Sequence, residues 1–297
     1  MEITHAQENQ YGLDIQEAKK SNIMTTGLTG SGKTRLAWAQ AEVLMKAGFQ
    51  VIVIDPVAVW RDSPIPYIVK VTPRTRLDWG EIMETKSVVF DISRLLIANQ
   101  LEFLDMISRH LFTSRVDRES PKQTMLVIEE ASTFVKYLRT QVAQNIYRLA
   151  FTGRNYGVRL MYIDPRLNSI PAEFRFLAGQ QFHGFANEVN ILNKIKRLYG
   201  AKWEQVMRSL NVGEFIRTQA GQDPTRIKVP LYQPKTTPVD YVMTVTPVVV
   251  QPTPLWFDDL VDYPEPVVVK KKGWAPFLIS VGGVLFIFWM FISYFLG

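Results

Sequence analysis

The chain has 297 residues, of which 47% are hydrophobic and 21% charged, a balance typical of globular proteins. It contains no cysteine, which excludes disulfides and thiolate metal sites, and its three histidines are too widely spaced for a ligand pattern and are interpreted as structural. The net charge is +6, and residues 234–297 carry four Lys and five Asp or Glu, so the basic excess lies before them. A basic front part suits a polyanionic partner.

Between about residues 21 and 232, short apolar runs alternate with helix-patterned segments, which predicts a mostly parallel sheet covered by helices. The runs are rich in β-branched residues, as strands buried on both faces should be, and they predict strands at 22–26, 51–55, 87–91, 125–129, 159–163 and 181–185. Helices are expected at 33–47, 98–115, 139–153, 187–199 and 201–210, and a small hairpin at 213–230 closes the domain. Residues 1–233 are therefore expected to form one domain.

A phosphate-binding pattern follows the first predicted strand. The pattern G-x-x-x-x-G-K-[ST] is matched in full by Gly27, Leu28, Thr29, Gly30, Ser31, Gly32, Lys33 and Thr34. Its glycines let backbone N–H groups curve around phosphates, where a Cβ would block the curve. In this pattern Lys33 reaches the β- and γ-phosphates, Thr34 offers its hydroxyl to Mg²⁺, and the following helix points its positive end at the same anion. The pattern predicts ATP and Mg²⁺ as ligands.

Two carboxylates, Glu129 and Glu130, follow the four apolar residues 125–128. At the carboxyl end of a central strand these side chains would face the phosphates. Glu129 is predicted to hold the Mg²⁺ shell, and Glu130 to polarise the attacking water as general base. The alternative is a solvated charge pair at a strand end, and the phosphate-binding pattern favours the functional interpretation.

After residue 233 the composition changes. Residues 234–273 are predicted to form an extended, Pro-rich linker, because seven prolines stand between positions 234 and 266, and the linker ends in Lys270, Lys271 and Lys272. Residues 274–297 contain no charged side chain and as a helix would reach roughly 35 Å, enough for a bilayer core of about 30 Å. They predict a single transmembrane helix, with a buried core helix as the alternative. The lysines would keep the N-terminal domain on the cytoplasmic or virion-interior side.

Four blocks stand in order along the chain: GLTGSGKT (27–34), VIVIDP (51–56), LVIEEAS (126–132) and FTGRNYGVRLMYIDPRLNSIPAEFR (151–175). Together they resemble the FtsK/HerA superfamily of ring-forming, DNA-pumping ATPases. The resemblance covers about residues 20–233. It implies an α/β P-loop NTPase fold of the RecA-like type with an additional strand and a catalytic glutamate, built on a mostly parallel central sheet. The short segment before the first strand leaves no room for the β-barrel of cellular HerA proteins. The chain therefore looks more like genome-packaging ATPases of membrane-containing viruses, and it also resembles the assembly ATPases of filamentous phages.

The resemblance also implies partners and further site residues. It implies a ring oligomer, expected to be a hexamer, in which an arginine of one subunit reaches the γ-phosphate of the next; Arg154 is the first candidate and Arg166 the second. It implies nonspecific binding of double-stranded DNA through the phosphate backbone, and capsid or membrane proteins are further expected partners. The candidate DNA contacts are Arg74, Arg76, Lys194, Lys196, Arg197 and Lys202. The last four alternate around a helix, and this pattern favours a solvated helix face over a DNA contact.

Two positions depart from the family pattern. Glu129 stands where the family usually has aspartate, and Pro165 stands where it has a sensor glutamine. Proline has no N–H and no side-chain amide to donate a hydrogen bond, so any sensing role passes to Asp164.

The function expected from these observations is a membrane-anchored, ATP-driven DNA-translocating motor that packages a viral genome or assembles virions. One alternative is an ATPase that drives export of filamentous virions or proteins, whose activity DNA need not stimulate. Another is a nucleotide-dependent membrane scaffold with little turnover. A cellular chromosome-segregation or repair motor is disfavoured by the short N-terminal segment and the C-terminal position of the span.

Overall fold

The computed structural model describes residues 10–75, 77, 80, 87–116, 122–136, 140–235 and 238–240. All of them belong to the first of the two units into which the chain divides, Met1–Thr246. The predicted membrane span 274–297 and most of the predicted linker lie outside the described residues. Within the described ranges, no helix has the length and apolar character needed to cross a membrane.

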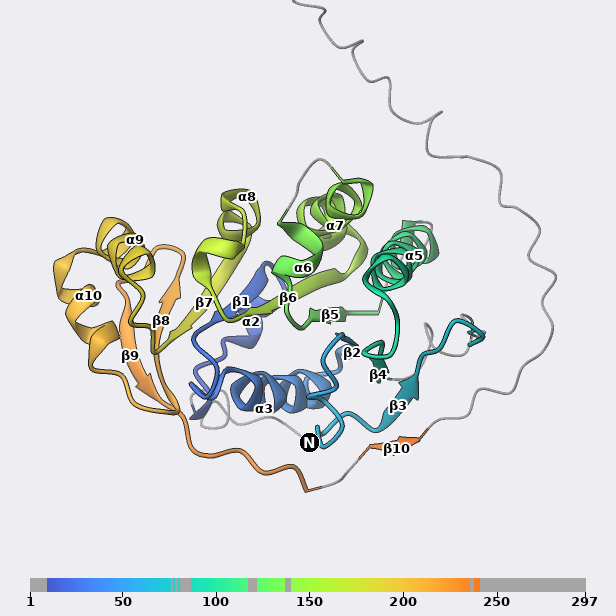
Figure 1. The fold of residues 1–297 in the computed structure, drawn as a ribbon, viewed down its shortest axis with the longest axis horizontal. Coiled ribbons are helices and arrows are strands. Elements are labelled where there is room, and N and C mark those ends of the chain that lie inside the picture. The colour runs from blue at the N-terminus through green and yellow to red at the C-terminus, as the bar shows by residue number, and fades with distance from the viewer. Residues whose placement is uncertain are drawn as a thin grey trace, which may run out of the picture. The chain divides into compact units, whose positions relative to one another are not determined.

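The described residues form one ten-stranded sheet in the order β10-β3-β4-β2-β5-β6-β1-β7-β8-β9 (Figure 1). Neighbours are parallel from β10 to β7, and the β7–β8 and β8–β9 pairs are antiparallel. The mostly parallel α/β sheet expected from the sequence is thus confirmed. The strands are β1 (Asn22–Thr26), β2 (Gln50–Asp55), β3 (Tyr67–Lys70), β4 (Val88–Asp91), β5 (Thr124–Ile128), β6 (Val158–Asp164), β7 (Ala178–Gly184), β8 (Glu214–Gln219), β9 (Thr225–Lys228) and β10 (Val239–Asp240).

The helices cover both faces of this sheet. In Figure 1, α3 lies on one face and α5, α7 and α8 lie on the other. The helices are α2 (Ile15–Ala18), α3 (Lys33–Lys46), α5 (Ile97–Val116), α6 (Ser132–Val135), α7 (Gln141–Thr152), α8 (Ala172–Phe176), α9 (Val189–Tyr199) and α10 (Ala201–Arg208), with 3-10 turns η1 (Gly153–Tyr156) and η2 (Leu167–Ser169). The five helices predicted from the sequence are present, and their ends agree within two residues.

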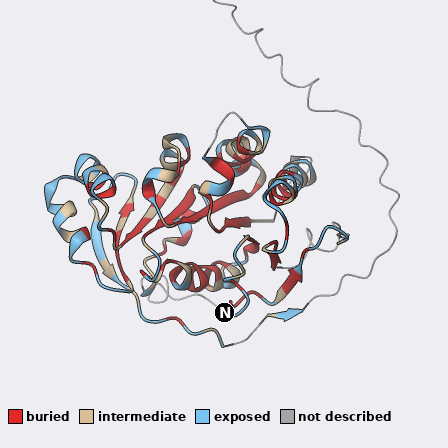
Figure 2. Cartoon of the chain, viewed as in Figure 1, coloured by how far each residue is buried: buried red, intermediate tan, exposed pale blue. Residues whose placement is uncertain are grey.

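The central strands β1, β2, β5 and β6 are buried at every position, and the middle of each is mostly apolar because both faces of the sheet are covered. In β2, Val51 and Val53 pack into the core beneath α3, while Ile52 and Ile54 pack into the core beneath α5 and α7. Successive side chains of a strand point to opposite faces, so a strand covered on both sides shows a continuous apolar run. Figure 2 shows these strands as the buried centre of the domain.

The order of the central strands decides where the functional residues meet. Strand β6 lies between β1 and β5 and is parallel to both, in the place of the additional strand that the expected fold class requires. In register, Thr26 of β1 stands beside Asp164 of β6, and Ile128 of β5 stands beside Tyr162. The segments that follow β1, β5 and β6 therefore emerge at the same edge of the sheet.

Several short elements were absent from the sequence expectation, among them β3, α8 and β10. Strand β3 is only four residues long and lies between Pro66 and Pro73, which obscure its apolar pattern. Helix α8 is a single short turn. Strand β10 falls inside the predicted linker and pairs with β3, where Asp240 accepts a 2.7 Å hydrogen bond from Lys70 Nζ. Because β10 is an edge strand, the preceding Pro238 removes no ladder hydrogen bond.

Candidate nucleotide-binding site

The phosphate-binding loop joins β1 to α3. Gly30 and Gly32 adopt left-handed backbone angles (φ +86° and +94°), which glycine reaches without steric cost. A Cβ on Gly27 would lie 2.7 Å from Ser31 Oγ and 3.1 Å from Gly184 Cα, so a side chain at this position would collide with the loop and with β7. A Cβ on Gly30 would meet nothing within 4 Å, which shows that the loop is open on that side.

Two segments distant in sequence hold this loop in place. The Leu28 N–H donates to the Phe185 carbonyl at the end of β7 (3.0 Å), and the Gly213 N–H donates to the Ser31 carbonyl (3.1 Å). A Cβ on Gly184 would lie 3.1 Å from Ser31 Cβ. Gly184 and Gly213 are thus supporting residues that sequence reasoning missed. Their only local signal is a glycine at a strand end and another at the start of a hairpin.

The start of α3 is built to receive an anion. Its first N–H groups have no intrahelical partners, and Gly32, the residue before the helix, has no side chain to cap them. Lys33 is buried beside them, with 7% of its surface exposed. Among the described residues, the buried Ser31 Oγ has no hydrogen-bond partner. Unpaired donors around an open glycine loop fit a bound phosphate group.

Glu129 contacts both the phosphate-binding loop and the loop after β2. Its Oε1 accepts a hydrogen bond from Thr34 Oγ1 (3.4 Å), and its Oε2 accepts one from the Trp60 indole N–H (2.8 Å). The side chain is 2% exposed. Burial raises the pKa of Glu129 to about 7; the Trp60 hydrogen bond and Lys33 oppose this rise, whereas the charges of Asp55 and Glu130 add to it.

The donors beside Thr34 suit Mg²⁺ in number and kind. A hydroxyl and a carboxylate are hard oxygen ligands, and Mg²⁺ in nucleotide sites is commonly held by one or two such groups together with substrate phosphates. The described residues contain no group of three or more His, Cys, Asp or Glu that could hold a metal alone. The pair Thr34 and Glu129 therefore fits a cation that arrives with a nucleotide.

Glu130 lies in the turn that joins β5 to α6. Its φ angle is +50°, a left-handed value that is costly for a residue with a side chain. Burial raises the pKa of Glu130, the charge of Asp164 raises it further, and Lys33 opposes the rise. The turn is held by the Ala131 N–H, which donates to the Ile163 carbonyl of β6 (3.0 Å). A strained, half-buried carboxylate therefore stands beside the phosphate-binding loop.

Asp164, the predicted sensor, ends β6 and is buried. Its two carboxylate oxygens accept hydrogen bonds from the backbone N–H groups of Ser132 (2.7 Å) and Arg166 (2.9 Å). Asp164 thus ties the turn that carries Glu130 to the turn after β6. A sensing role for this residue stays a prediction.

The two candidate arginines lie beyond opposite ends of strand β6, and therefore on opposite sides of the sheet along the strand direction. Arg154 lies in η1, before β6, and is exposed, whereas Arg166 follows the carboxyl end of β6. The seven residues of β6 separate them by roughly 20 Å. Arg166 is 61% exposed and its Nε lies 3.3 Å from Glu188 Oε1. Arg154 therefore stands away from the phosphate-binding loop of its own chain, and Arg166 stands on the same edge as that loop.

The DNA-contact candidates fall in separate places. Arg74 is exposed in the loop after β3, and Arg76 lies outside the described residues. Lys194, Lys196 and Arg197 lie on α9 and Lys202 on α10. Lys196 is 3.9 Å from Glu204, which is consistent with a solvated helix face. Whether either group contacts DNA stays a prediction.

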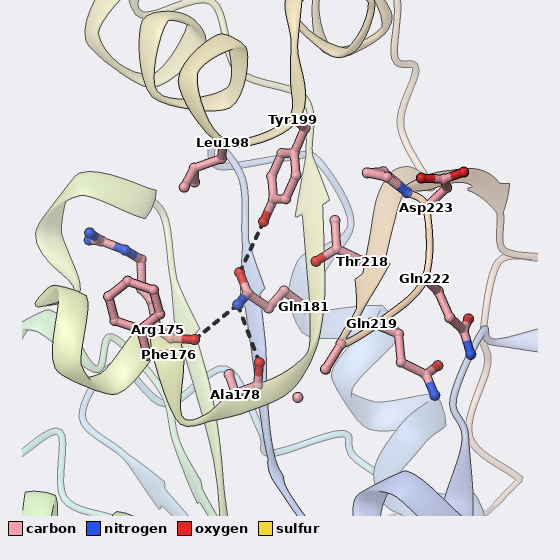
Figure 3. Close-up of a pocket in the computed structure, with 13 residues that line it drawn as sticks. Arg175, Phe176, Ala178, Gln181, Leu198, Tyr199, Thr218, Gln219, Gln222 and Asp223 are labelled. Carbon is pink, nitrogen blue, oxygen red and sulfur yellow. Dashed lines mark hydrogen bonds between the residues drawn. The ribbon is translucent and has the colours of Figure 1, made fainter.

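A pocket of about 470 Å³ lies at the amino end of β7, bordered by the ends of α8 and α9 and the β8–β9 turn (Figure 3). Gln181 lies at its centre and donates to the Arg175 and Ala178 carbonyls (2.9 and 3.2 Å), and Tyr199 OH lies 3.4 Å from its Oε1. The phosphate-binding loop contacts the other end of β7. The pocket is therefore separate from the nucleotide site.

His183, between these two regions, is structural. One ring nitrogen lies 2.9 Å from Thr26 Oγ1 and the other 3.4 Å from Tyr199 OH. Burial, assisted by the charge of Arg175, lowers the pKa of His183 to about 4. The ring is therefore neutral near pH 7 and fixes the end of β1 just before the phosphate-binding loop, in agreement with the interpretation made from the sequence.

No protein-family model and no curated protein matches the sequence. Solved structures, however, share its fold. The genome packaging NTPase B204 from Sulfolobus turreted icosahedral virus 2 in complex with sulfate aligns with a TM-score of 0.57 and 18% identity over 72% of this chain and 98% of that chain. The same NTPase in complex with ATP-gammaS aligns with a TM-score of 0.56 and 18% identity, covering 72% and 99%. VirB4 of Thermoanaerobacter pseudethanolicus aligns with a TM-score of 0.55 and 13% identity, covering 70% and 89%. The resemblance to viral genome-packaging ATPases is thus confirmed for the fold.

The backbone strain at Glu130 can be measured with two variants. Glu130→Gly and Glu130→Ala both remove the carboxylate, but only glycine relieves the left-handed φ of +50°. We expect the free energy of unfolding, measured by chemical denaturation, to be about 1 kcal/mol higher for Glu130→Gly than for Glu130→Ala. Equal stabilities would show that the turn is not strained.

The raised pKa of Glu129 predicts how stability depends on pH without ligands. Folding raises this pKa from 4.5 to about 7, so the folded state holds the proton more tightly, and stability falls as the pH rises from 4.5 to 7. Glutamine in Glu129→Gln can accept from the Trp60 indole with its oxygen and donate to the Thr34 hydroxyl with its amide nitrogen, but it cannot ionise. The free energy of unfolding of Glu129→Gln, relative to that of the wild type, should therefore increase by on the order of 3 kcal/mol between pH 4.5 and pH 8.

Urea denaturation of the nucleotide-free protein at several pH values measures this difference. The exposed carboxylate of Glu173 provides the control, because Glu173→Gln should show no comparable gain. Parallel pH profiles of the wild type and Glu129→Gln would contradict the expectation.

Proposed function

We propose that the chain is a Mg²⁺-dependent ATPase whose turnover drives movement of double-stranded DNA, in viral genome packaging or virion assembly. One observation carries the proposal. The carboxyl edge of β1, β6 and β5 brings Thr34 of a complete phosphate-binding loop within 3.4 Å of Glu129, with Glu130 beside it. The likeness in fold to a genome packaging NTPase whose structure is in complex with ATP-gammaS supports the same activity here.

The residues of the site would divide the chemistry of hydrolysis. Lys33 and the N–H groups at the start of α3 bind the phosphate oxygens. Glu130 takes a proton from water as that water attacks the γ-phosphorus; the bond to the bridging oxygen breaks, and ADP and phosphate leave. The raised pKa of Glu130 makes it a stronger base near neutral pH. Thr34 and Glu129 would hold Mg²⁺, which when bound neutralises charge on the β- and γ-phosphates.

An arginine from a neighbouring subunit completes the proposed site in a ring, taken to be a hexamer. Arg154 is the first candidate because it is exposed and stands at the edge of the sheet opposite its own phosphate-binding loop, so it could reach only another subunit's nucleotide. Arg166 is the second candidate, on the nucleotide edge and paired with Glu188. An arginine supplied in trans is typically worth 10³–10⁵ in rate.

The remaining parts of the proposal concern partners and place. The basic excess before residue 234 supports nonspecific binding of the DNA backbone. The uncharged segment 274–297, preceded by three lysines, supports a single membrane span with the ATPase domain on the cytoplasmic or virion-interior side. Capsid or membrane proteins would be the partners of such an anchored motor.

ATP hydrolysis by the full chain in detergent, with and without double-stranded DNA, tests the motor function. We expect DNA to stimulate turnover, Lys33→Ala to abolish ATP binding, and Glu130→Gln to bind ATP but lower turnover by about 10²-fold or more. Turnover that DNA does not change would favour an export ATPase. Nucleotide binding with no turnover would favour a scaffold.

Mixed oligomers test the arginine in the same assay. Arg154→Ala and Glu130→Gln should each be nearly inactive alone. Mixing them creates interfaces that combine an intact Glu130 with an intact Arg154, so activity should return. The same mixture made with Arg166→Ala is the comparison; recovery with Arg166→Ala but not with Arg154→Ala would reverse the assignment.

The membrane span makes a separate prediction. The full chain expressed in cells should stay in the membrane fraction after alkaline carbonate extraction. Deletion of 274–297 should release it, and Leu285→Arg should weaken insertion, because an arginine near the middle of a span costs about 3 kcal/mol or more. Release of the unaltered full chain by carbonate would show that 274–297 does not anchor it.

A further inference from the structure

A tryptophan from a different part of the chain holds the carboxylate at the phosphate-binding loop. Trp60 lies in the loop after β2, 69 positions before Glu129, and is fully buried. Its indole N–H donates a 2.8 Å hydrogen bond to Glu129 Oε2, while Thr34 Oγ1 donates to Oε1 at 3.4 Å. The two oxygens of Glu129 therefore have different partners, one on each side.

The loop that carries Trp60 is itself fixed. Asp55, at the end of β2 and buried, accepts hydrogen bonds from the backbone N–H groups of Trp60 (2.8 Å) and Val57 (3.1 Å). The Ser63 N–H donates to the Trp60 carbonyl (3.1 Å). The indole also packs against the ring of Trp38, with centroids 6.2 Å apart. Trp60 can therefore hold Glu129 because its own backbone and ring are held.

The bond to Glu129 is more than a way to satisfy a buried N–H group. Trp38, in the same core and beside Trp60, is also buried, and its indole N–H has no partner among the described residues. Burial in this core does not by itself supply a tryptophan with an acceptor. The Trp60 bond selects one carboxylate oxygen and leaves the other on the side of Thr34.

The length of the side chain explains why such a bond matters here. Glutamate has one more rotatable bond than aspartate. Its carboxylate therefore has more orientations to lose when it binds a cation. A fixed hydrogen bond to one oxygen restricts those orientations before any ligand arrives. Partners of this kind, one step removed from a metal, typically change metal affinity or activity by 10–100-fold.

We propose that Trp60 is a positioning residue of the nucleotide site: its indole N–H holds Oε2 of Glu129 so that Oε1 faces Thr34 and Mg²⁺ that arrives with ATP. The proposal rests on the proposed ATPase function and adds to it a residue with no place in the sequence motifs. In this role Trp60 acts through Glu129.

The test compares Trp60→Phe with Trp38→Phe in the full chain. Both variants replace a buried indole of the same core by a smaller ring, but only Trp60→Phe removes a hydrogen bond. The readout is the rise in melting temperature caused by a non-hydrolysable ATP analogue, first without Mg²⁺ and then over a Mg²⁺ titration. ATP turnover over the same Mg²⁺ range is the second readout.

We expect Trp60→Phe to respond to the Mg²⁺-free analogue as the wild type does but to need about 10-fold more Mg²⁺ for the half-maximal further rise. Trp38→Phe should stay within about twofold of the wild type. If Trp60→Phe does not fold, benzothienylalanine at position 60, which replaces the N–H by sulfur and keeps the ring shape, provides the same comparison.

The outcomes separate this proposal from the proposed function. Equal Mg²⁺ requirements for Trp60→Phe and Trp38→Phe, with an active wild type, would overturn the positioning role and leave the ATPase function standing. A wild type that neither gains stability from the analogue with Mg²⁺ nor hydrolyses ATP would overturn both.

Discussion

The site depends on a concentration of carboxyl groups in a part of the protein that is largely closed to water. Asp55, Glu129 and Asp164 are buried at the ends of β2, β5 and β6, and Glu130 is half buried beside them. Burial raises the pKa of Asp55, Glu129 and Glu130, so each of these groups resists ionisation in the absence of a ligand. Lys33 offsets part of the charge that these groups carry when ionised. A divalent cation bound with a polyphosphate would change the balance at this edge of the sheet, which links the stability of the domain to the occupancy of the site.

These carboxylates differ in their hydrogen-bond partners, and the partners indicate different roles. Asp55 and Asp164 use both oxygens on backbone N–H groups, so their work is to shape the loops after β2, β5 and β6. The carboxylate of Glu129 accepts hydrogen bonds from the side chains of Thr34 and Trp60. Glu130 instead takes its position from a left-handed backbone conformation. Because Asp164 is committed to two turns, a change in its position would move the segment of Glu130 and the segment of Arg166 together. This is a physical route by which a position next to Pro165 could report on the site without the amide of a glutamine.

Much of the fold and part of the site could be predicted from the sequence. The central strands contain apolar runs because both of their faces are covered, so they could be predicted. The phosphate-binding loop has a fixed spacing, which predicts Lys33 and Thr34, and the two glutamates could be proposed because they directly follow an apolar run. Trp60 could not, because its contact with Glu129 joins positions 69 apart and leaves no local pattern. The support of the loop by Gly184 and Gly213 likewise depends on how β7 and β8 fold back. That Arg154 and Arg166 lie beyond opposite ends of β6 became clear only from the position and direction of this strand in the sheet.

Both margins of the sheet, within the described residues, are poorly suited to being extended by another chain. At one margin β9 reads Thr-Arg-Ile-Lys, with its charged side chains exposed; at the other, β10 has two residues and follows Pro238. Charges, proline and short length are the features that discourage backbone pairing between molecules. Copies of this domain that associate would therefore meet through side-chain surfaces, which can separate and re-form without unzipping a shared ladder. Contacts of that kind would leave associated copies free to shift against one another, a freedom that a continuous intermolecular sheet would deny them.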